Sequence, residues 1–310
     1  MRYQEFSFTS FYQEVSSEEK AILFVWNWKL NGDPFRCSCS HREYYQHVSR
    51  PEIRECKKCG KQHRVRSGTI FQNSKVSLSK WLHALFFMMS GKRGISALEL
   101  QKHLGLKSYK TSWGMLQKIR MALIDRDALY KLSGEIEVDG SQFGKRRSGT
   151  DQDVIIGIES KRWVDEKGEE KSKAGFAQVM LGDENKENAQ TFISRKIAPD
   201  STLIVDGAKA YDLKLDDVRI KSKVTLGDKE ILSHWHPWVH RFVSNAKVWI
   251  LGTHHGICPK YLKNYLGEYV YRFNRRHDTK KLFSRALRAC LETKPRTILQ
   301  ISSPLPALTG

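Results

Sequence analysis

The pattern of hydrophobic and polar residues changes character about halfway along the chain. Before residue 130, apolar residues recur at helical spacing, as in SSEEKAILFVWNWKL, where Ser17 is a suitable N-cap, and in LSKWLHALFFMM. After residue 134, short runs rich in β-branched residues predict four strands, which are EIEVDG, DVIIGIE, GFAQVML and TLIVDG. A helical segment, NAQTFISRKI, precedes the last of them. The second half therefore predicts a mixed α/β layer.

These patterns divide the chain into five parts. They are an N-terminal helix over residues 1–30, a cysteine-containing part over 31–75, a helical region over 76–130, an α/β domain over 131–295 and a C-terminal tail over 296–310. In the helical region, SALELQKHLGL and SYKTSWGMLQKIRMALIDR flank a turn with Gly105, which is the shape of a helix–turn–helix unit. Its first helix would bury Leu98, Leu100 and Leu104. The charged stretch 161–173 predicts an exposed hairpin connection.

The net charge points to a polyanion as the partner. The chain has 310 residues, with 53 Lys and Arg against 34 Asp and Glu, which gives a formal net charge of +19. Basic residues recur along the whole chain, in KKCGKQHRVR, GKRRSG and RFNRRHDTKK among others. This favours a long surface that follows a nucleic-acid backbone over a single basic tail. No apolar run reaches a membrane span, and the segment MRYQEFSFTS lacks a signal-peptide pattern, so we expect a cytoplasmic, nucleoid-associated location.

Four of the six cysteines lie close together in the sequence. They are Cys37, Cys39, Cys56 and Cys59. Clustered cysteines in a basic intracellular protein favour a metal over disulfides, and four thiolates predict one structural Zn²⁺. The first pair is spaced CxC and the second CxxC, and His41 or His63 could replace one thiolate. A cluster of buried thiols without a metal is the alternative.

Two predicted strands end in the same three residues, Val-Asp-Gly, and place Asp139 and Asp206 after a buried apolar run. Asp-Gly is also a turn signal, so either aspartate alone could be a turn residue. A cluster of five histidines follows, comprising His234, His236, His240, His254 and His255. On a helix over 239–251, His240 and Lys247 share a face, and Asn245 points about 140° away from His240. Two aspartates on strands and a third group on a helix suit two-metal phosphoryl transfer on nucleic acid.

Longer segments resemble a known family. CSCSHREYY, ECKKCGKQHRVRSGTIF, GISALELQKHLGLKSYKTSWGMLQKIR, LGTHHG and YRFNRR are similar to segments of bacterial insertion-sequence transposases, and the resemblance covers roughly residues 18–288. It implies a metal-dependent DDE-type transposase that cuts the ends of its own element and joins them to target DNA. The implied architecture is a zinc ribbon, a helix–turn–helix region and an RNase H-like catalytic domain.

The resemblance also implies roles for individual residues. Asp139 and Asp206 would hold two Mg²⁺ or Mn²⁺ ions, and His240 occupies the third position, where many relatives have a glutamate. Asn245 is a weaker candidate for that position, and Lys247 would hold a phosphate near the scissile bond. A neutral imidazole removes one negative charge from the metal site, which favours Mn²⁺. The predicted DNA-contacting residues are Lys110, Lys118, Arg120, Arg272, Arg275 and Arg276.

The expected partners are the terminal inverted repeats of the element and the target DNA, bound by a homo-oligomer that we expect to be a dimer on DNA. Two other functions remain open. The first would explain why the third acidic position of the family is not acidic here, and the second would use the same metal-dependent cleavage chemistry. One is a catalytically degenerate, transposase-derived DNA-binding protein. The other is a related nuclease that cuts without joining.

Overall fold

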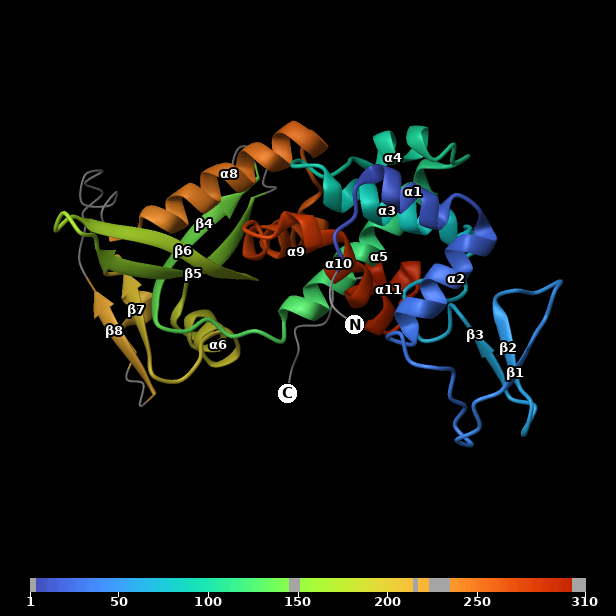
Figure 1. The fold of residues 1–310 in the computed structure, drawn as a ribbon. Helices are drawn as coiled ribbons and strands as arrows, with labels where there is room; N and C mark the ends of the chain where they lie inside the picture. The colour runs from blue at the N-terminus through green and yellow to red at the C-terminus, as the bar shows by residue number, and fades with distance from the viewer. Residues whose placement is uncertain (1–3, 145–150, 214–216, 223–234, 303–310) are drawn as a thin grey trace. The chain divides into compact units, whose positions relative to one another are not determined.

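The computed structural model describes residues 4–144, 151–213, 217–222 and 235–302, and the chain forms two compact units (Figure 1). One unit comprises residues 1–126 and 277–310, and the other comprises residues 127–276. The sequence placed 277–295 with the α/β domain, whereas the structure assigns this segment to the first unit. The reason is that helix α10 (Leu282–Glu292) buries its apolar face against α3 (Leu78–Ser90), with the rings of Phe283 and Phe86 5.6 Å apart.

The rest of the first unit is largely helical. Its other helices are α1 (Phe8–Val15), α2 (Glu18–Lys29), α4 (Ala97–His103), α5 (Tyr109–Asp127, whose last residue belongs to the second unit) and α11 (Ile298–Ser302), and the short 3-10 helix η4 (Thr279–Lys281) precedes α10. Ser17 caps α2 as predicted, since its side chain accepts a hydrogen bond from the N–H of Lys20 at 3.3 Å. Helix α11 lies in the predicted C-terminal tail, so part of that tail is helical. The tail beyond residue 302 lies outside the described residues.

The predicted helix pair is present as α4 and α5, with Gly105 between them at a φ of +55°. The predicted burial is correct for Leu100 and wrong for Leu98, which is 55% exposed. These two leucines are two positions apart, which is about 200° around a helix, so they cannot share one buried face.

A small three-stranded antiparallel sheet carries the cysteines. Its strands are β1 (Tyr44–Gln46), β2 (Ile53–Cys56) and β3 (Gln62–Arg64), in the order β1-β2-β3. The guanidinium of Arg54 lies between the rings of Trp26 on α2 and Tyr44, 4.5 Å from each centroid. This cation–π contact fastens the sheet to the helical part of the unit.

The second unit is built on a mixed five-stranded sheet, which confirms the predicted α/β fold. Its strands are β4 (Glu135–Phe143), β5 (Gln152–Val164), β6 (Glu170–Leu181), β7 (Ser201–Val205) and β8 (Val218–Ser222). In the order β6-β5-β4-β7-β8, the first three are antiparallel, and β7 and β8 run parallel to β4. The predicted connection at 161–173 is the outer part of the β5–β6 hairpin. The edge strand β8 was not predicted because its sequence, VRIKS, is mostly exposed and polar.

Helices cover both faces of this sheet (Figure 1). On one face, α6 (Lys186–Lys196) packs Phe192 and Ile193 onto Ile136 and Val138 of β4. On the other, α8 (Pro237–His254) and α9 (Leu262–Asn274) share a core with β5. Short 3-10 helices, η2 (Lys209–Tyr211) and η3 (Pro259–Tyr261), complete the unit. Across the described residues, none of the helices is long and apolar enough to span a membrane.

Candidate active site

The two aspartates of the Val-Asp-Gly motifs lie at the same level of adjacent strands. In the parallel β4–β7 pair, Glu135 is opposite Thr202 and Glu137 is opposite Ile204. Continuing this register by two residues brings Asp139 opposite Asp206. Neighbouring strands are about 4.8 Å apart, so the two carboxylates are close. Burial, and then the negative charge of Asp206, raise the pKa of Asp139 to about 6.

The two motifs nevertheless differ in backbone structure. We expected both strands to end at the aspartate, which is wrong for β4: its antiparallel pairing with β5 continues to Phe143, opposite Gln152. Strand β7 does end before Asp206, where Gly207 has a φ of +88°. There the Asp206 side chain accepts the N–H of Ala208 at 3.2 Å and closes a turn. Asp139 is therefore a strand residue, and Asp206 is a turn residue.

A third carboxylate that the sequence did not identify lies beside them. Glu184 follows β6 and precedes α6. A Cβ atom at Gly140 would lie only 2.5 Å from Glu184 Oε2, so the glutamate lies directly over the residue after Asp139. Burial, and then the charge of Asp139, raise the pKa of Glu184 to about 7. The sequence signal for Glu184 was the acidic segment DENKEN. Such a segment is also common at the start of a helix, where Asn caps the first turn and acidic residues are favoured.

A buried tyrosine faces the same carboxylates. Tyr211, in η2, is 3% exposed, and its buried hydroxyl lies beside the Glu184 carboxylate. Burial, then the charge of Glu184 and a weak hydrogen bond to it, raise the pKa of this hydroxyl, with smaller contributions from Asp139 and Asp206. The hydroxyl is therefore a neutral donor beside an acidic cluster.

The start of α8 is fastened to the strands that carry the aspartates. Glu137 of β4 is fully buried, and its Oε2 accepts the N–H groups of Trp238 and Val239 at 2.8 and 3.2 Å. Trp235 donates its indole N–H to the carbonyl of Val205, and His236 Nε2 lies 2.9 Å from the carbonyl of Ile204. A carboxylate bound to free N–H groups in the first turn stabilises a helix start. These bonds place the first turn of α8 beside Asp206.

His240 and Lys247 both lie on the exposed face of α8. Partial burial lowers the pKa of His240, although the nearby charge of Asp206 opposes the shift, and this favours the neutral imidazole. Lys247 Nζ lies 5.4 Å from the ring centroid of Phe143, at the far end of β4. Asn245 is exposed on another side of the helix. The structure thus brings His240 towards the aspartates and places Lys247 further along the same strand.

The other histidines do not join this site. His236 is buried at the helix start, and His254 packs between the rings of Trp249 and Tyr265, with centroids 4.9 and 4.7 Å away. The distance along the helix from His240 to His254 is about 21 Å. His255 ends α8 with a φ of +54°, and His234 lies outside the described residues. The sequence clustering of histidines therefore does not reflect one common site.

The predicted DNA-contacting residues differ in exposure. Lys110 is exposed, Lys118, Arg272 and Arg276 are half-buried, and Arg120 and Arg275 are buried. Arg275 Nη2 forms an ion pair with Asp127 Oδ1 at 2.6 Å, and Arg276 donates to the carbonyls of Ala174 and Gly175. The prediction that Arg120 and Arg275 contact DNA does not fit their burial at 1% and 9% exposure. Arg275 and Arg276 instead hold the end of α9 within the second unit.

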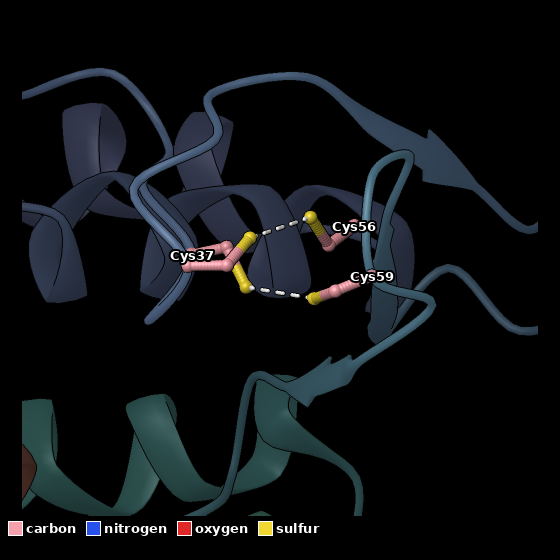
Figure 2. A group of neighbouring side chains, drawn as sticks. Cys37, Cys56 and Cys59 are labelled. Carbon is pink, nitrogen blue, oxygen red and sulfur yellow. Dashed lines mark hydrogen bonds between the residues drawn. The ribbon is translucent and has the colours of Figure 1, made fainter.

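The four predicted thiols form a compact cluster in the first unit (Figure 2). All four sulfur atoms lie within 4.8 Å of one another, and the closest pairs, Cys37–Cys59 and Cys39–Cys56, are 3.6 Å apart. Sulfur atoms around a tetrahedral Zn²⁺ are about 3.8 Å apart, given Zn–S bonds of about 2.3 Å. The donor set therefore fits zinc, and Gly60, with a φ of +70°, closes the second turn.

The two histidines that could have replaced a thiolate have other positions. His63 Nε2 lies 3.3 Å from Cys37 Sγ and can donate a hydrogen bond to it, as outer partners of metal sites do. His41 contributes its backbone carbonyl to the N–H of Cys37 at 2.9 Å. The N–H of Cys39 is the largest of the effects that lower the pKa of Cys37 to about 5, which favours the thiolate.

Comparison with known proteins gives a match to the unit that carries the carboxylates. Residues 131–274 match the family model of the ISXO2-like transposase domain. The chain is also 26% identical over 256 residues to an uncharacterized protein in transposable element ISH50 of Halobacterium salinarum, which covers 77% of this chain and 83% of that protein. Both findings confirm the predicted resemblance to insertion-sequence transposases and support a transposase function.

Proposed function

We propose that this chain, whose residues 131–274 match the family model of the ISXO2-like transposase domain, cuts the ends of its own insertion element and joins them to target DNA. The observation that carries the proposal is the side-by-side placement of Asp139 and Asp206 within that domain. Oxygen donors of this kind suit Mg²⁺ or Mn²⁺. When bound there, such ions would activate the attacking oxygen and stabilise the leaving oxygen of the phosphodiester.

The chain's own residues would have distinct tasks in this reaction. Asp139 and Asp206 would hold the cations in their ionised form, and His240 would add a neutral nitrogen donor from α8. Lys247, on the same helix face, would bind a phosphate of the DNA beside the reacting one. Glu137 would keep α8 in place against β4, because its carboxylate binds the helix N-terminus.

DNA binding would rest mainly on the first unit. Its thiol cluster, with one structural Zn²⁺, and its α4–α5 pair would recognise the element ends, with exposed Lys110 on α5 among the contacts. The net charge of +19 implies many phosphate contacts. Affinity for DNA should therefore fall by orders of magnitude between about 50 and 200 mM salt if six or more phosphates are neutralised. We expect a dimer to hold the two element ends together.

The test is a reaction of the purified protein with labelled element-end DNA and Mg²⁺ or Mn²⁺. Cleaved ends and ends joined to a second DNA are the expected products. Asp139→Asn and Asp206→Asn should lower both products at least about 1,000-fold, since metal placement is lost, and should leave DNA binding nearly intact. Asp212→Asn is the matched control, because the Asp212 side chain is 90% exposed in the same unit.

The products also separate the alternative functions. Cleavage without joining would identify a nuclease, and DNA binding with neither product, under either metal, would identify a degenerate DNA-binding protein. Either result would reject the proposal of a cutting and joining enzyme.

A second set of variants tests whether His240 is the third ligand of the metal site. His240→Ala should be almost as damaging as the aspartate variants, and His240→Glu should retain activity with a shift towards Mg²⁺, because it restores an oxygen donor. Asn245→Ala should be mild. Normal activity of His240→Ala together with a severe loss in Asn245→Ala would move this role to Asn245.

A further inference from the structure

We infer that Glu184 is a third carboxylate ligand of the divalent-cation site at Asp139 and Asp206. The inference rests on the proposed function, because it adds a ligand to the same site. It assigns a role to a residue outside both Val-Asp-Gly motifs and outside α8, in the turn between β6 and α6.

The first support is the close approach of Glu184 to the strand that carries Asp139. A Cβ at Gly140 would lie 2.5 Å from Glu184 Oε2 and 2.8 Å from Glu184 Cδ, so only glycine leaves room for this carboxylate. The N–H of Gly140 acts on both Asp139 and Glu184 and lowers the pKa of each. Glycine is therefore needed at position 140 because a side chain would not fit. Backbone conformation does not require it, since the φ of Gly140, unlike that of Gly207, is not in the left-handed region.

The second support is a pair of buried polar groups with little compensation. Glu184 Oε1 and the Tyr211 hydroxyl are both buried without a hydrogen bond of full geometry, and the hydroxyl acts on the Glu184 carboxylate as a hydrogen-bond donor. A buried carboxylate with a single weak donor is costly unless a further partner binds it. Within the described residues, the side-chain charges that act on Asp139 and Glu184 are those of other carboxylates. A cation between these carboxylates, with its bound water, would offset their charges and give Glu184 Oε1 a further partner.

The third support is that the backbone holds Glu184 in place. Asn185 caps α6 by accepting the N–H of Asn188 at 2.9 Å, and Asn188 Nδ2 donates to the carbonyl of Asp183 at 2.9 Å. The N–H of Gly182 is bound to the carbonyl of Asp153 at 2.9 Å. Beside this turn is an open cavity of about 200 Å³, lined in part by Glu184 and Asp153. A ligand on a fixed turn keeps its geometry before the ion arrives.

A third carboxylate resolves the shortage of negative charge that His240 leaves at the site. Divalent cations of this class prefer several oxygen ligands, and two aspartates alone offer few. Glu184 would supply the oxygen donor from the β6–α6 turn, while His240 would supply a nitrogen donor from α8. The chain would thus place its third acidic ligand before the second aspartate in sequence.

The test measures Mn²⁺ binding to the full-length protein by calorimetry and by the electron paramagnetic resonance signal of free Mn²⁺. Mn²⁺ prefers oxygen donors, so thiolates compete poorly for it. Glu184→Gln should weaken Mn²⁺ affinity at least about 10-fold, and its melting temperature in EDTA should be unchanged or higher. Glu187→Gln, an exposed carboxylate on α6, is the matched control and should bind Mn²⁺ normally.

Gly140→Ala provides an independent variant, because its methyl group would displace the Glu184 carboxylate without removing it. It should reproduce the weaker Mn²⁺ binding while the far-ultraviolet circular dichroism stays unchanged. If Glu184→Gln binds Mn²⁺ as the unmodified protein does, while Asp139→Asn and Asp206→Asn lose binding, Glu184 is not a ligand and the proposed function stands. If none of these variants changes Mn²⁺ binding, the cation site itself is rejected, and the proposed function fails with it.

Discussion

The thiol cluster of the first unit and the proposed carboxylate site of the second are assembled in opposite ways. Cys37, Cys39, Cys56 and Cys59 come from two tight turns of one small sheet. The carboxylates come from a strand interior, from the turn before α6 and from the turn after β7. The first site is a product of local sequence spacing, whereas the second depends on how distant segments pair.

The two clusters also differ in what they contribute without a metal. The thiols must lose their protons when zinc binds, and metal binding then supplies folding energy. The sheet places Asp139 and Asp206 on adjacent strands, and burial and the charges of neighbouring carboxylates raise the pKa of Asp139 and of Glu184. We therefore expect the first site to need a metal in order to fold, and the second to fold at a cost that a metal would offset.

The largest effect on folding stability should come from breaking the thiol cluster. Cys56→Ser removes one of four zinc ligands, and structural zinc contributes roughly 10–16 kcal/mol to the folding of small zinc domains. Zinc content should fall and affinity for element-end DNA should drop at least about 100-fold, measured by metal analysis and gel shift. Mn²⁺ binding to the second unit should stay normal. Cys258→Ser, at an exposed thiol, is the control. Full zinc content in Cys56→Ser would contradict the four-thiolate site.

The next prediction tests whether the proposed carboxylate site depends on the hydrogen bonds that hold the start of α8 to Glu137. Glu137→Ala removes the acceptor for two N–H groups of α8, which should cost roughly 1–3 kcal/mol and lower the joining rate about 10- to 100-fold. Glu137→Gln keeps an acceptor oxygen and should recover most of the activity, measured by strand joining and thermal melting. A Glu137→Ala protein with normal joining would show that the position of α8 does not matter.

A smaller effect should reveal the electrostatic cost of the carboxylate site. The raised pKa of Asp139 means that its ionised form is disfavoured in the folded state. Its stabilising contribution is present below about pH 4 and is lost as the pH rises through about 6. Asp139→Asn should therefore stabilise the protein in EDTA at pH 8 by roughly 2 kcal/mol, and less as the pH falls towards 4. Thermal melting with and without Mn²⁺ measures both effects. An unchanged melting temperature in EDTA at pH 8 would mean that the repulsion is absent.

The smallest effect concerns basic residues that look alike in sequence. Lys110→Ala should weaken DNA binding several-fold and reduce the salt dependence by about one phosphate contact, with no change in melting temperature. Arg120→Ala should instead lower the melting temperature, because Arg120 is buried. Salt titrations and melting curves separate the two outcomes. Equal losses of DNA affinity without a loss of stability would show that Arg120 reaches DNA after all.

The sequence predicted the local parts of this molecule well. Periodicity gave the helix capped by Ser17, the α4–α5 pair and the strands β4 to β7, because hydrophobic spacing follows directly from helix and strand geometry. The spacing of the cysteines gave the four-thiol cluster for the same reason. Burial of individual side chains was harder to predict. Leu98, Arg120 and Arg275 have the expected chemistry, but their orientation depends on neighbours from other elements.

By itself, the amino-acid sequence determined the mixed α/β class and the set of four clustered cysteines, and it singled out the two motif aspartates as candidate ligands. Only the tertiary structure decided that β4 continues past Asp139, that Glu137 holds α8 and that Glu184 lies over Gly140. The physical reason is the range of the interactions. Spacing within one turn or strand is set by covalent geometry. A contact between a turn and a strand that are far apart in the sequence forms only when the strands of the sheet pair in their native register.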